Sequence, residues 1–437
     1  MTRWLLLGVS AVLAVGCTEG ELGNATTDED AAIATGDALD PSDSTFDGAG
    51  DSVVDSTVGP LPDTAGIDVP AVPYDGAPAD FGTGGCTFSG SSLAAALTTT
   101  IVAGATPSGE APILAERPGG LVVAWASGAG WRVTPLDATG ARAGSDIAID
   151  GLKVYGVAAG ADGFAVLVSR APDYMTLLRT DASGAVVNTK NLVGGGNHAT
   201  VGTEWFGEFA NTGRLVATPT GFAAYFGIHR RWPDMIGHQG DTLRLFDGSG
   251  NPAGVNWDWG CSHSLDQRLA YGTRIGGLCV SDCYPQKAVM LNHNQTMVSS
   301  EPSGNCSGGS SARLGGIAGD ATGFVAAVLS KEGRTSLDVK VVKVGTDSKV
   351  SATTWLSTTP EDETSLHLAR FGGAWLAGWQ NGGNKLQRVD GAGAAAGALE
   401  TITAPWPGHD FVSLASGDTA WAANDAGKLT IVRVRCL

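Results

Sequence analysis

The sequence lacks the short motifs that mark several common classes of enzyme. Its 437 residues contain no Gly-Lys-Ser/Thr phosphate-binding loop, no Gly-x-Ser-x-Gly nucleophile turn and no His-Glu-x-x-His zinc motif. The Trp-Asp dipeptide and the Ser-x-Asp-x-Gly-x-Thr-Trp box of sialidase-like proteins do not recur either. These absences argue against phosphate-loop nucleotide hydrolases, serine hydrolases, zinc peptidases and sialidases.

Positive charge is absent from a long stretch near the amino terminus. Between Cys17 and Cys86 the chain has 15 Asp and Glu and no Lys or Arg, amid Gly, Ala, Thr, Ser and Pro. Such a segment cannot bury enough apolar surface to offset the entropy lost when it becomes ordered. We therefore expect residues 17–85 to form a disordered, self-repelling acidic linker.

The remaining chain has little excess charge of either sign. Residues 86–437 contain 29 Asp and Glu against 26 Lys and Arg, so most of the formal net charge of −17 belongs to the linker. No basic stripe or basic-aromatic pattern is present that would neutralise phosphates. Nucleic acid is therefore not an expected partner.

The amino-terminal apolar run is too short to cross a membrane. It covers residues 5–15, after Arg3, whereas a spanning helix needs about 20 apolar residues. A positive start, a short apolar core and a small residue before the cleavage point indicate a secretory signal peptide over residues 1–16.

The end of this signal resembles the lipobox of bacterial lipoproteins. Leu13-Ala14-Val15-Gly16-Cys17 fits that pattern except at Ala14, where Leu is usual. The resemblance implies cleavage before Cys17 and attachment of lipid to its sulfur and amine, which would anchor the chain to a membrane. Because Thr18 rather than Asp follows the cysteine, it implies sorting to the outer membrane, on the periplasmic or cell-surface side.

Helical periodicity is almost absent from residues 86–437, and a unit of about fifty residues recurs instead. Each unit has a short apolar strand, a Gly-containing turn, a strongly apolar strand, a third strand and a weaker fourth strand. Several third strands end at Asp-x-x-Gly, which is typical of type I turns. The strongly apolar strand occurs seven times, starting at Gly120, Gly163, Gly221, Gly277, Gly323, Gly373 and Thr419.

Four strands per repeat at this period predict an all-β fold, a β-propeller of seven four-stranded blades over residues 86–437. Six or eight blades remain as alternatives. The glycine spacing resembles that of surface lipoproteins built as repeat propellers in Gram-negative bacteria. This resemblance is architectural and implies no catalytic residues.

Six cysteines remain after Cys17, as three disulfides would require. The last repeat stops at Cys436 without a fourth strand, and residues 94–102, just after Cys86, can supply one. We therefore expect a Cys86–Cys436 disulfide that closes the ring. We favour Cys261–Cys279 and Cys283–Cys306 for the other four. Zinc at Cys279-x-x-x-Cys283 is the weaker alternative, because export favours oxidation.

The long connections between predicted strands all fall on one face of the ring, mainly between His229 and Cys306. They are expected at residues 194–209, 228–241, 257–265, 282–287 and 302–311. Function on loops held by a rigid scaffold is the usual pattern. The side chains expected to converge there include His198, Glu204, Trp205, His229, Trp232, His238, Asp241, Trp257, Trp259, His263 and Asp282.

Two of these connections contain His and Asp at the same spacing, His238-Gln-Gly-Asp241 and His263-Ser-Leu-Asp266. Such groups suit a general base with its orienting acid, so all four are candidate catalytic residues. His238, Asp241 and His263 are also candidate ligands of a divalent metal. Structural hydrogen bonding between blades is the competing interpretation, and no cofactor is otherwise predicted.

The same face carries candidate ligand-binding residues. Exposed Trp offers a large contact area, and Arg stacks on it or pairs with carboxylates. We expect an outer-membrane lipoprotein whose propeller binds a carbohydrate, or an envelope or extracellular protein, through the loops of blades 3 and 4. An exported hydrolase or lyase using the His and Asp residues is the alternative. The candidate ligand-binding residues are Arg230, Arg231, Trp232, Trp257, Trp259 and His263.

Overall fold

A computed structural model describes residues 86, 88–90, 92–207, 211–258, 261, 266–281, 288–292, 296–300 and 311–436. The predicted signal peptide, Cys17 and the acidic linker lie outside the described residues, as do Trp259, His263, Cys283 and Cys306. The described part is built from strands, and it contains no helix with the length and apolar character needed to span a membrane.

The strands form seven antiparallel sheets, which are the blades of the propeller. Most blades have four strands that follow one another in chain order. Blade 3 has a fifth strand, and blade 7 combines strands from both ends of the propeller. Blades 1 and 2 comprise β2 (Ile113–Arg117), β3 (Gly120–Ser127), β4 (Gly130–Asp137), β5 (Ile147–Ile149), β6 (Lys153–Gly160), β7 (Gly163–Ser169), β8 (Met175–Asp181) and β9 (Val186–Val193). Blades 3 and 4 comprise β10 (Glu204–Trp205), β11 (Gly213–Thr218), β12 (Gly221–Arg231), β13 (Gly237–Asp247), β14 (Pro252–Asp258), β15 (Gln267–Tyr271), β16 (Ile275–Ser281), β17 (Ala288–Leu291) and β18 (Thr296–Ser300). Blades 5 to 7 comprise β19 (Arg313–Asp320), β20 (Gly323–Ser330), β21 (Asp338–Gly345), β22 (Val350–Trp355), β23 (Thr364–Phe371), β24 (Ala374–Gln380), β25 (Asn384–Val389), β26 (Ala395–Ile402), β27 (Val412–Ser413), β28 (Thr419–Asp425), β29 (Lys428–Val434) and β1 (Leu97–Ile101).

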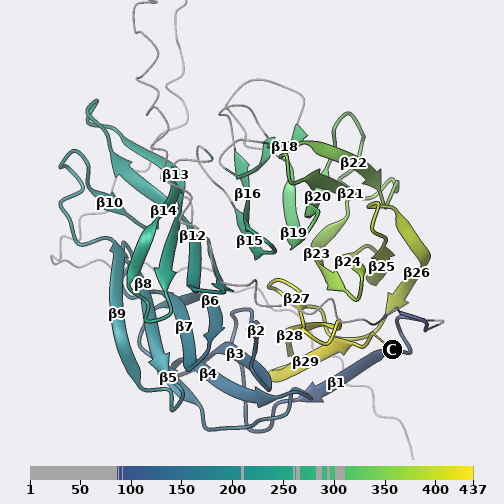
Figure 1. Ribbon diagram of the computed structural model, residues 1–437, viewed down its shortest axis with the longest axis horizontal. Coiled ribbons are helices and arrows are strands. Elements are labelled where there is room, and N and C mark those ends of the chain that lie inside the picture. The colour runs from purple at the N-terminus through teal and green to yellow at the C-terminus, as the bar shows by residue number, and fades with distance from the viewer. Residues whose placement is uncertain are drawn as a thin grey trace, which may run out of the picture. The chain divides into compact units, whose positions relative to one another are not determined.

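The first strands of successive blades contact one another in a closed circle. β2 contacts β6, β6 contacts β11, and the series continues through β15, β19 and β23 to β27, which returns to β2. The ribbon shows the same ring (Figure 1). The prediction of a seven-bladed propeller with four-stranded blades is therefore confirmed.

The turns at the ends of the third strands follow the predicted chemistry. The carboxylate of Asp137 accepts hydrogen bonds from the backbone N–H of Thr139 at 2.8 Å and of Ala141 at 3.0 Å. The hydroxyl of Thr139 and these N–H groups lower the pKa of Asp137. Gly140 closes the turn with φ of 85°, a conformation that favours glycine. Asp181, Asp247 and Asp390 make the same carboxylate contacts at their own turns.

The core lies between neighbouring blades, because both faces of each inner strand are covered. Phe164 of blade 2 packs with Val122 and Val133 of blade 1, and Phe222 of blade 3 packs with Leu167 of blade 2. Further buried clusters join the remaining blades in the same way. Such packing holds each first strand at a fixed distance from the axis.

Blade 7 closes the ring with strands from both ends of the propeller. β1 pairs along its whole length with β29, from Leu97 opposite Val434 to Ile101 opposite Thr430. The Cys86–Cys436 disulfide lies beside this pair and confirms the predicted closure. It joins residues 350 positions apart.

Blade 3 departs from the sequence prediction at residues 228–241. A long loop is expected there, but β12 and β13 continue as a regular hairpin up to Arg231 opposite Gly237. The short strand β10 adds to its edge, with Glu204 opposite Arg230 and Trp205 opposite His229. The expected loop is therefore an ordered projection of the blade, for which we use the name blade 3 extension (residues 197–205 and 228–240).

Candidate functional site

Aromatic side chains form the interior of the blade 3 extension. The rings of His198 and Trp205 stack with centroids 4.3 Å apart, and Trp205 stacks on His229 at 5.3 Å. Trp205 and His229 are only 3% and 2% exposed, although Trp205 belongs to the edge strand β10. The stack gives this projecting hairpin a small core of its own.

Arginine side chains next to this aromatic stack form ion pairs and hydrogen bonds within the extension. Glu204 accepts a hydrogen bond from Arg230 Nε at 2.8 Å and another from Arg244 at 2.7 Å. Arg230 also pairs with Asp258 at 3.0 Å. Arg231 donates from Nε to the carbonyl oxygen of His198 at 2.6 Å. Both predicted ligand-binding arginines thus hold the extension together in this structure.

The two described candidate tryptophans have different surroundings. Trp257 packs edge-on against Tyr225, with ring centroids 5.6 Å apart, in the cluster between blades 3 and 4. Trp232 lies half-buried at the end of the hairpin, with its ring 5.8 Å from that of His238. Both rings are half-buried, but only Trp232 belongs to the projecting end of the hairpin.

The turn that ends the extension exposes apolar side chains. Met235 and Ile236 are 55% and 57% exposed, and backbone hydrogen bonds between Trp232 and residues 235 and 236 close the turn. Met235 has φ of 64°, which a non-glycine residue seldom adopts. We call residues 232–236 the extension tip.

The structure does not bring His238 and Asp241 together. They lie three residues apart on β13, so their side chains face opposite sides of the strand. His238 is partly exposed, with Nε2 2.8 Å from Asp234 Oδ2. Asp241 is fully buried and accepts hydrogen bonds from Tyr225 Oη at 2.5 Å and the Cys261 N–H at 3.1 Å.

Asp241 lies close to two sulfur atoms, those of Cys261 and Cys279. These cysteines form the second predicted disulfide, so they offer no thiolate for a metal. Burial and the Asp241 carboxylate raise the pKa of the Tyr225 hydroxyl well above its usual value, which keeps it a hydrogen-bond donor. This group therefore has the character of a structural network between blades 3 and 4.

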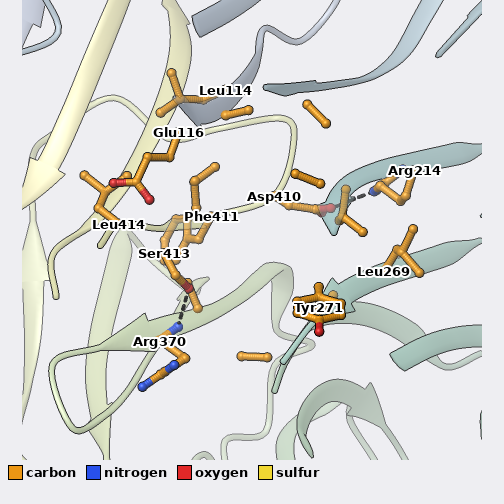
Figure 2. A pocket seen from close by; sticks show the side chains of 18 of the residues that line it. Leu114, Glu116, Arg214, Leu269, Tyr271, Arg370, Asp410, Phe411, Ser413 and Leu414 are labelled. Carbon is orange, nitrogen blue, oxygen red and sulfur yellow. Dashed lines mark hydrogen bonds and ion pairs between the residues drawn. The ribbon is translucent and has the colours of Figure 1, made fainter. Parts of the chain in front are cut away.

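Asp266, the remaining described candidate, belongs to a second charged network at the axis. Its Oδ1 accepts from Arg268 at 2.6 Å and from the Gln267 N–H at 2.9 Å. Arg268 Nε lies 3.0 Å from Asp410 Oδ1, and Arg214 Nε lies 2.6 Å from Asp410 Oδ2. Figure 2 shows the contact between Arg214 and Asp410.

This network crosses the propeller axis. Asp410 precedes β27 of blade 7, whereas Arg214 and Arg268 belong to the first strands of blades 3 and 4, which lie across the ring from it. Burial alone would raise the pKa of the Asp410 carboxyl, but the two arginines hold it far below its usual range. The connection before β27 therefore closes one end of the axial channel with an ionised group.

Two histidines lie beside the ion pair. His367 stacks on Phe411 with ring centroids 5.0 Å apart and is 5% exposed. Burial lowers the pKa of both His367 and His409 to about 3, and the nearby arginines act in the same direction. Both imidazoles are accordingly neutral at physiological pH.

Below the ion pair the channel holds a cavity of about 240 Å³. The first strand of every blade contributes to its wall, and its lining includes Leu114, Glu116, Leu215, Leu269, Tyr271, Ile317, Leu368, Arg370, Phe411, Ser413 and Leu414. The lining is apolar along its middle and carries charged groups toward both ends (Figure 2). Enclosed, mostly apolar cavities with a few convergent polar groups are typical small-molecule sites.

The sequence interpretation missed this channel, although a signal for it is present. Arg-Leu occupies the start of the first strand in three successive blades, at Arg214, Arg268 and Arg313. A repeated cation at a position close to the axis needs a counter-charge or an anionic ligand. For Arg214 and Arg268 the counter-charge comes from Asp410, which no local sequence pattern connects to them.

Comparisons with known proteins identify no family for this chain. No protein-family profile matches the sequence. No curated protein is similar to it at a significant level.

Solved propellers resemble the chain distantly. The Cps50 (Swd1) β-propeller domain of Myceliophteria thermophila has 10% identity and a TM-score of 0.41, covering 76% of this chain and 99% of that one. BBS1N, solved in complex with ARL6DN, has 11% identity and a TM-score of 0.46, covering 77% and 95%. The Neurospora crassa Pan2 WD40 domain has 10% identity and a TM-score of 0.44, covering 75% and 89%. At these scores the likeness carries no argument about function.

Proposed function

We propose that this protein is an exported lipoprotein whose propeller binds a protein partner through the extension tip. The observation that carries this proposal is the exposure of Met235 and Ile236 at the end of a hairpin that is internally braced. Apolar side chains on a rigid projection lose little entropy when they are buried by a partner. Met and aromatic residues are also enriched in protein interfaces.

A protein suits this surface better than a carbohydrate. Sugar recognition would need exposed ring faces, but Trp257 packs on Tyr225, and Trp232 is half-buried with its ring nearly perpendicular to that of His238. Branched and thioether side chains such as those of Ile236 and Met235 fit an apolar pocket on another protein. The geometry of His238 and Asp241 adds no support for the hydrolase or lyase alternative.

The location proposed for the protein rests on its amino-terminal sequence. Lipid on Cys17 would hold the chain at the outer membrane, and the acidic linker of residues 17–85 would separate the propeller from the lipid. A flexible chain of this length has an average reach of roughly 45 Å. Replacement of Cys17 by Ser should release the protein into the soluble envelope fraction and abolish incorporation of labelled palmitate.

The partner hypothesis is tested by photocrosslinking in intact cells. A photoreactive amino acid replacing Trp232, at the extension tip, should give one discrete crosslinked product, whose second protein is then identified and purified. Its affinity for residues 86–437 should fall roughly tenfold or more in the double variant Met235→Ser, Ile236→Ser. Val187→Ser is the matched control, because Val187 is 62% exposed on the outer strand of blade 2. Equal affinity for the double variant and the control would refute the assignment of this surface.

A further inference from the structure

The outer strands of blades 1 to 6 have features that disfavour pairing with a further strand. A register shift against the third strand of the blade occurs in β9, β14, β18, β22 and β26. Such bulges bend an edge strand and increase its twist, so that a flat partner strand fits it poorly. β5 pairs without a shift but has only three residues.

β1, the outer strand of blade 7, lacks these features. It lies at the outside of the ring beside β29 (Figure 1), and its five residues pair with β29 without a register shift. Its sequence, Leu-Thr-Thr-Thr-Ile, contains no charged residue, proline or glycine. A regular, uncharged edge rich in β-branched residues is a template for a further strand. β1 is therefore the outer strand of the described propeller that is open to pairing.

The backbone groups of β1 alternate between its paired edge and its open edge. Just before the strand, the carbonyl oxygen of Ala96 accepts a hydrogen bond from the Arg435 N–H at 3.0 Å. Just after it, the Val102 N–H donates to the carbonyl oxygen of Leu429 at 2.9 Å. Because alternate residues of an antiparallel pair bond to the partner strand, the even-numbered residues of β1 bond to β29.

The odd-numbered residues, Leu97, Thr99 and Ile101, direct their N–H and C=O groups to the open edge. Among the described residues, only the Leu97 N–H has an acceptor, the carbonyl oxygen of Ala94 at 3.4 Å. Thr99 and Ile101 are exposed residues. Thr99 and Ile101 thus offer free backbone donors and acceptors in one row, and Leu97 adds a free acceptor.

We propose that two copies of this chain associate through the open edges of β1, which pair antiparallel about a two-fold axis at Thr99. Thr99 lies opposite the partner's Thr99, and Leu97 lies opposite the partner's Ile101. The blade 7 sheets of the two copies then form one continuous sheet. β1 belongs to blade 7 and the extension tip to blade 3, so the proposal does not depend on the proposed partner protein.

A second copy suits this edge because the edge is symmetric and uncharged. The outward-facing residues lie evenly about Thr99, so the same strand rotated by half a turn places an acceptor opposite each free donor. The side chain of Ile101, which is 58% exposed, would be covered by the partner's Leu97. Identical strands also bring like side chains together, and like charges opposite each other destabilise a sheet. β1 avoids this repulsion, whereas β9 contains Lys190 and β26 contains Glu400.

Sedimentation of residues 86–437, and of the longer chain carrying Cys17→Ser, tests the association. Both proteins should be dimeric at about 100 µM and should dissociate on dilution. Thr99→Pro removes an N–H that faces the open edge, a position where an edge strand tolerates proline, so the ring should stay folded. It should weaken dimerisation at least roughly tenfold. Thr99→Lys, which places like charges opposite each other at the two-fold axis, should do the same.

Crosslinking tests the register of the two strands. In a hydrogen-bonded antiparallel pair the Cα atoms are about 5.5 Å apart, within the range of about 4.4–6.8 Å that a disulfide spans. Mild oxidation should therefore join two copies of the Thr99→Cys variant. Val187→Cys, on the outer strand of blade 2, is the matched control, because Val187 is 62% exposed and should give no crosslink.

The proposal is overturned if residues 86–437 are monomeric at about 100 µM. It is also overturned if a dimer forms and neither Thr99 substitution weakens it, or if Val187→Lys weakens it equally. Thermal unfolding confirms that each variant is folded. A dimer of residues 86–437 without a dimer of the longer chain would show that residues 17–85 cover the edge, and would overturn the proposal for the intact protein.

Discussion

Asp410 and Arg214 form an ion pair across the axis of the propeller, although 196 residues separate them in the chain. Arg268 shares the same carboxylate from the neighbouring blade. Three blades are therefore connected through one side chain at the centre of the ring. Because the pair connects these blades and its side chains are only 13% and 23% exposed, its loss should affect the whole propeller.

Replacement of Asp410 by Asn should be strongly destabilising. It leaves Arg214 without its counter-charge; breaking a fully buried pair costs about 3–5 kcal/mol, and the partial exposure of both side chains lowers the expected loss to about 2–3 kcal/mol. Urea denaturation of residues 86–437 measures the change, with the exposed Asp425→Asn as control. The double variant Asp410→Leu, Arg214→Met should recover part of the loss. Equal stability of Asp410→Asn and the control would contradict a structural role for the pair.

Stability should fall as the pH is lowered from about 6.5. The pKa values of His367 and His409 are lowered from 6.5 to about 3 in the folded protein, so between these values the unfolded chain binds more protons. Each histidine then contributes a slope approaching about 1.4 kcal/mol per pH unit. Unfolding free energies at pH 7, 6 and 5 test this above the usual range of carboxyl groups. His367→Gln should reduce the slope.

The ring-closing disulfide should contribute more than the internal one. Cys86–Cys436 closes a separation of 350 residues, and Cys261–Cys279 closes one of 18. In the chain-entropy description these loops correspond to about 6 and about 3 kcal/mol. Paired replacement by Ala, followed by urea denaturation, compares them directly. A larger loss from the Cys261 and Cys279 variant would show that strain or local packing outweighs the entropy of closure.

The two described tryptophans of the proposed binding face should respond differently to substitution. Trp257→Ala removes a ring packed on Tyr225 between blades 3 and 4, so we expect a loss of about 3 kcal/mol in unfolding free energy. Trp232→Ala, at the extension tip, should cost less than about 1 kcal/mol. Thermal unfolding separates the two, and similar losses would place Trp232 in a core as well.

The fold could be predicted because its signals are local and repeated. The strongly apolar second strand recurs once per blade and the Asp-x-x-Gly turn recurs in several blades, and each unit has too little core to fold alone. The ring-closing disulfide could be predicted from the same repetition, because Cys436 follows the third strand of the last repeat, where the other repeats turn into a fourth strand. These features depend on neighbouring residues in the chain.

The parts that sequence reasoning missed depend on distant contacts. Residues 228–241 resemble a loop because charged residues and glycines replace the apolar alternation of a strand. They form a hairpin because Trp205, from a separate connection, packs on His229 and supplies the missing core. The pairing of Asp410 with Arg214 likewise becomes visible only once the ring is closed.

The disulfide at the closure also determines how the propeller responds to a pull on its amino terminus. Without it, tension applied at residue 86 would fall directly on β1 and could peel that strand from β29 one hydrogen bond at a time. Since Cys86 is covalently joined to Cys436, the load passes to the end of β29 as well, and both strands are loaded together. A protein held by its amino-terminal segment in a moving fluid would therefore keep its ring closed under forces that would unzip a single terminal strand.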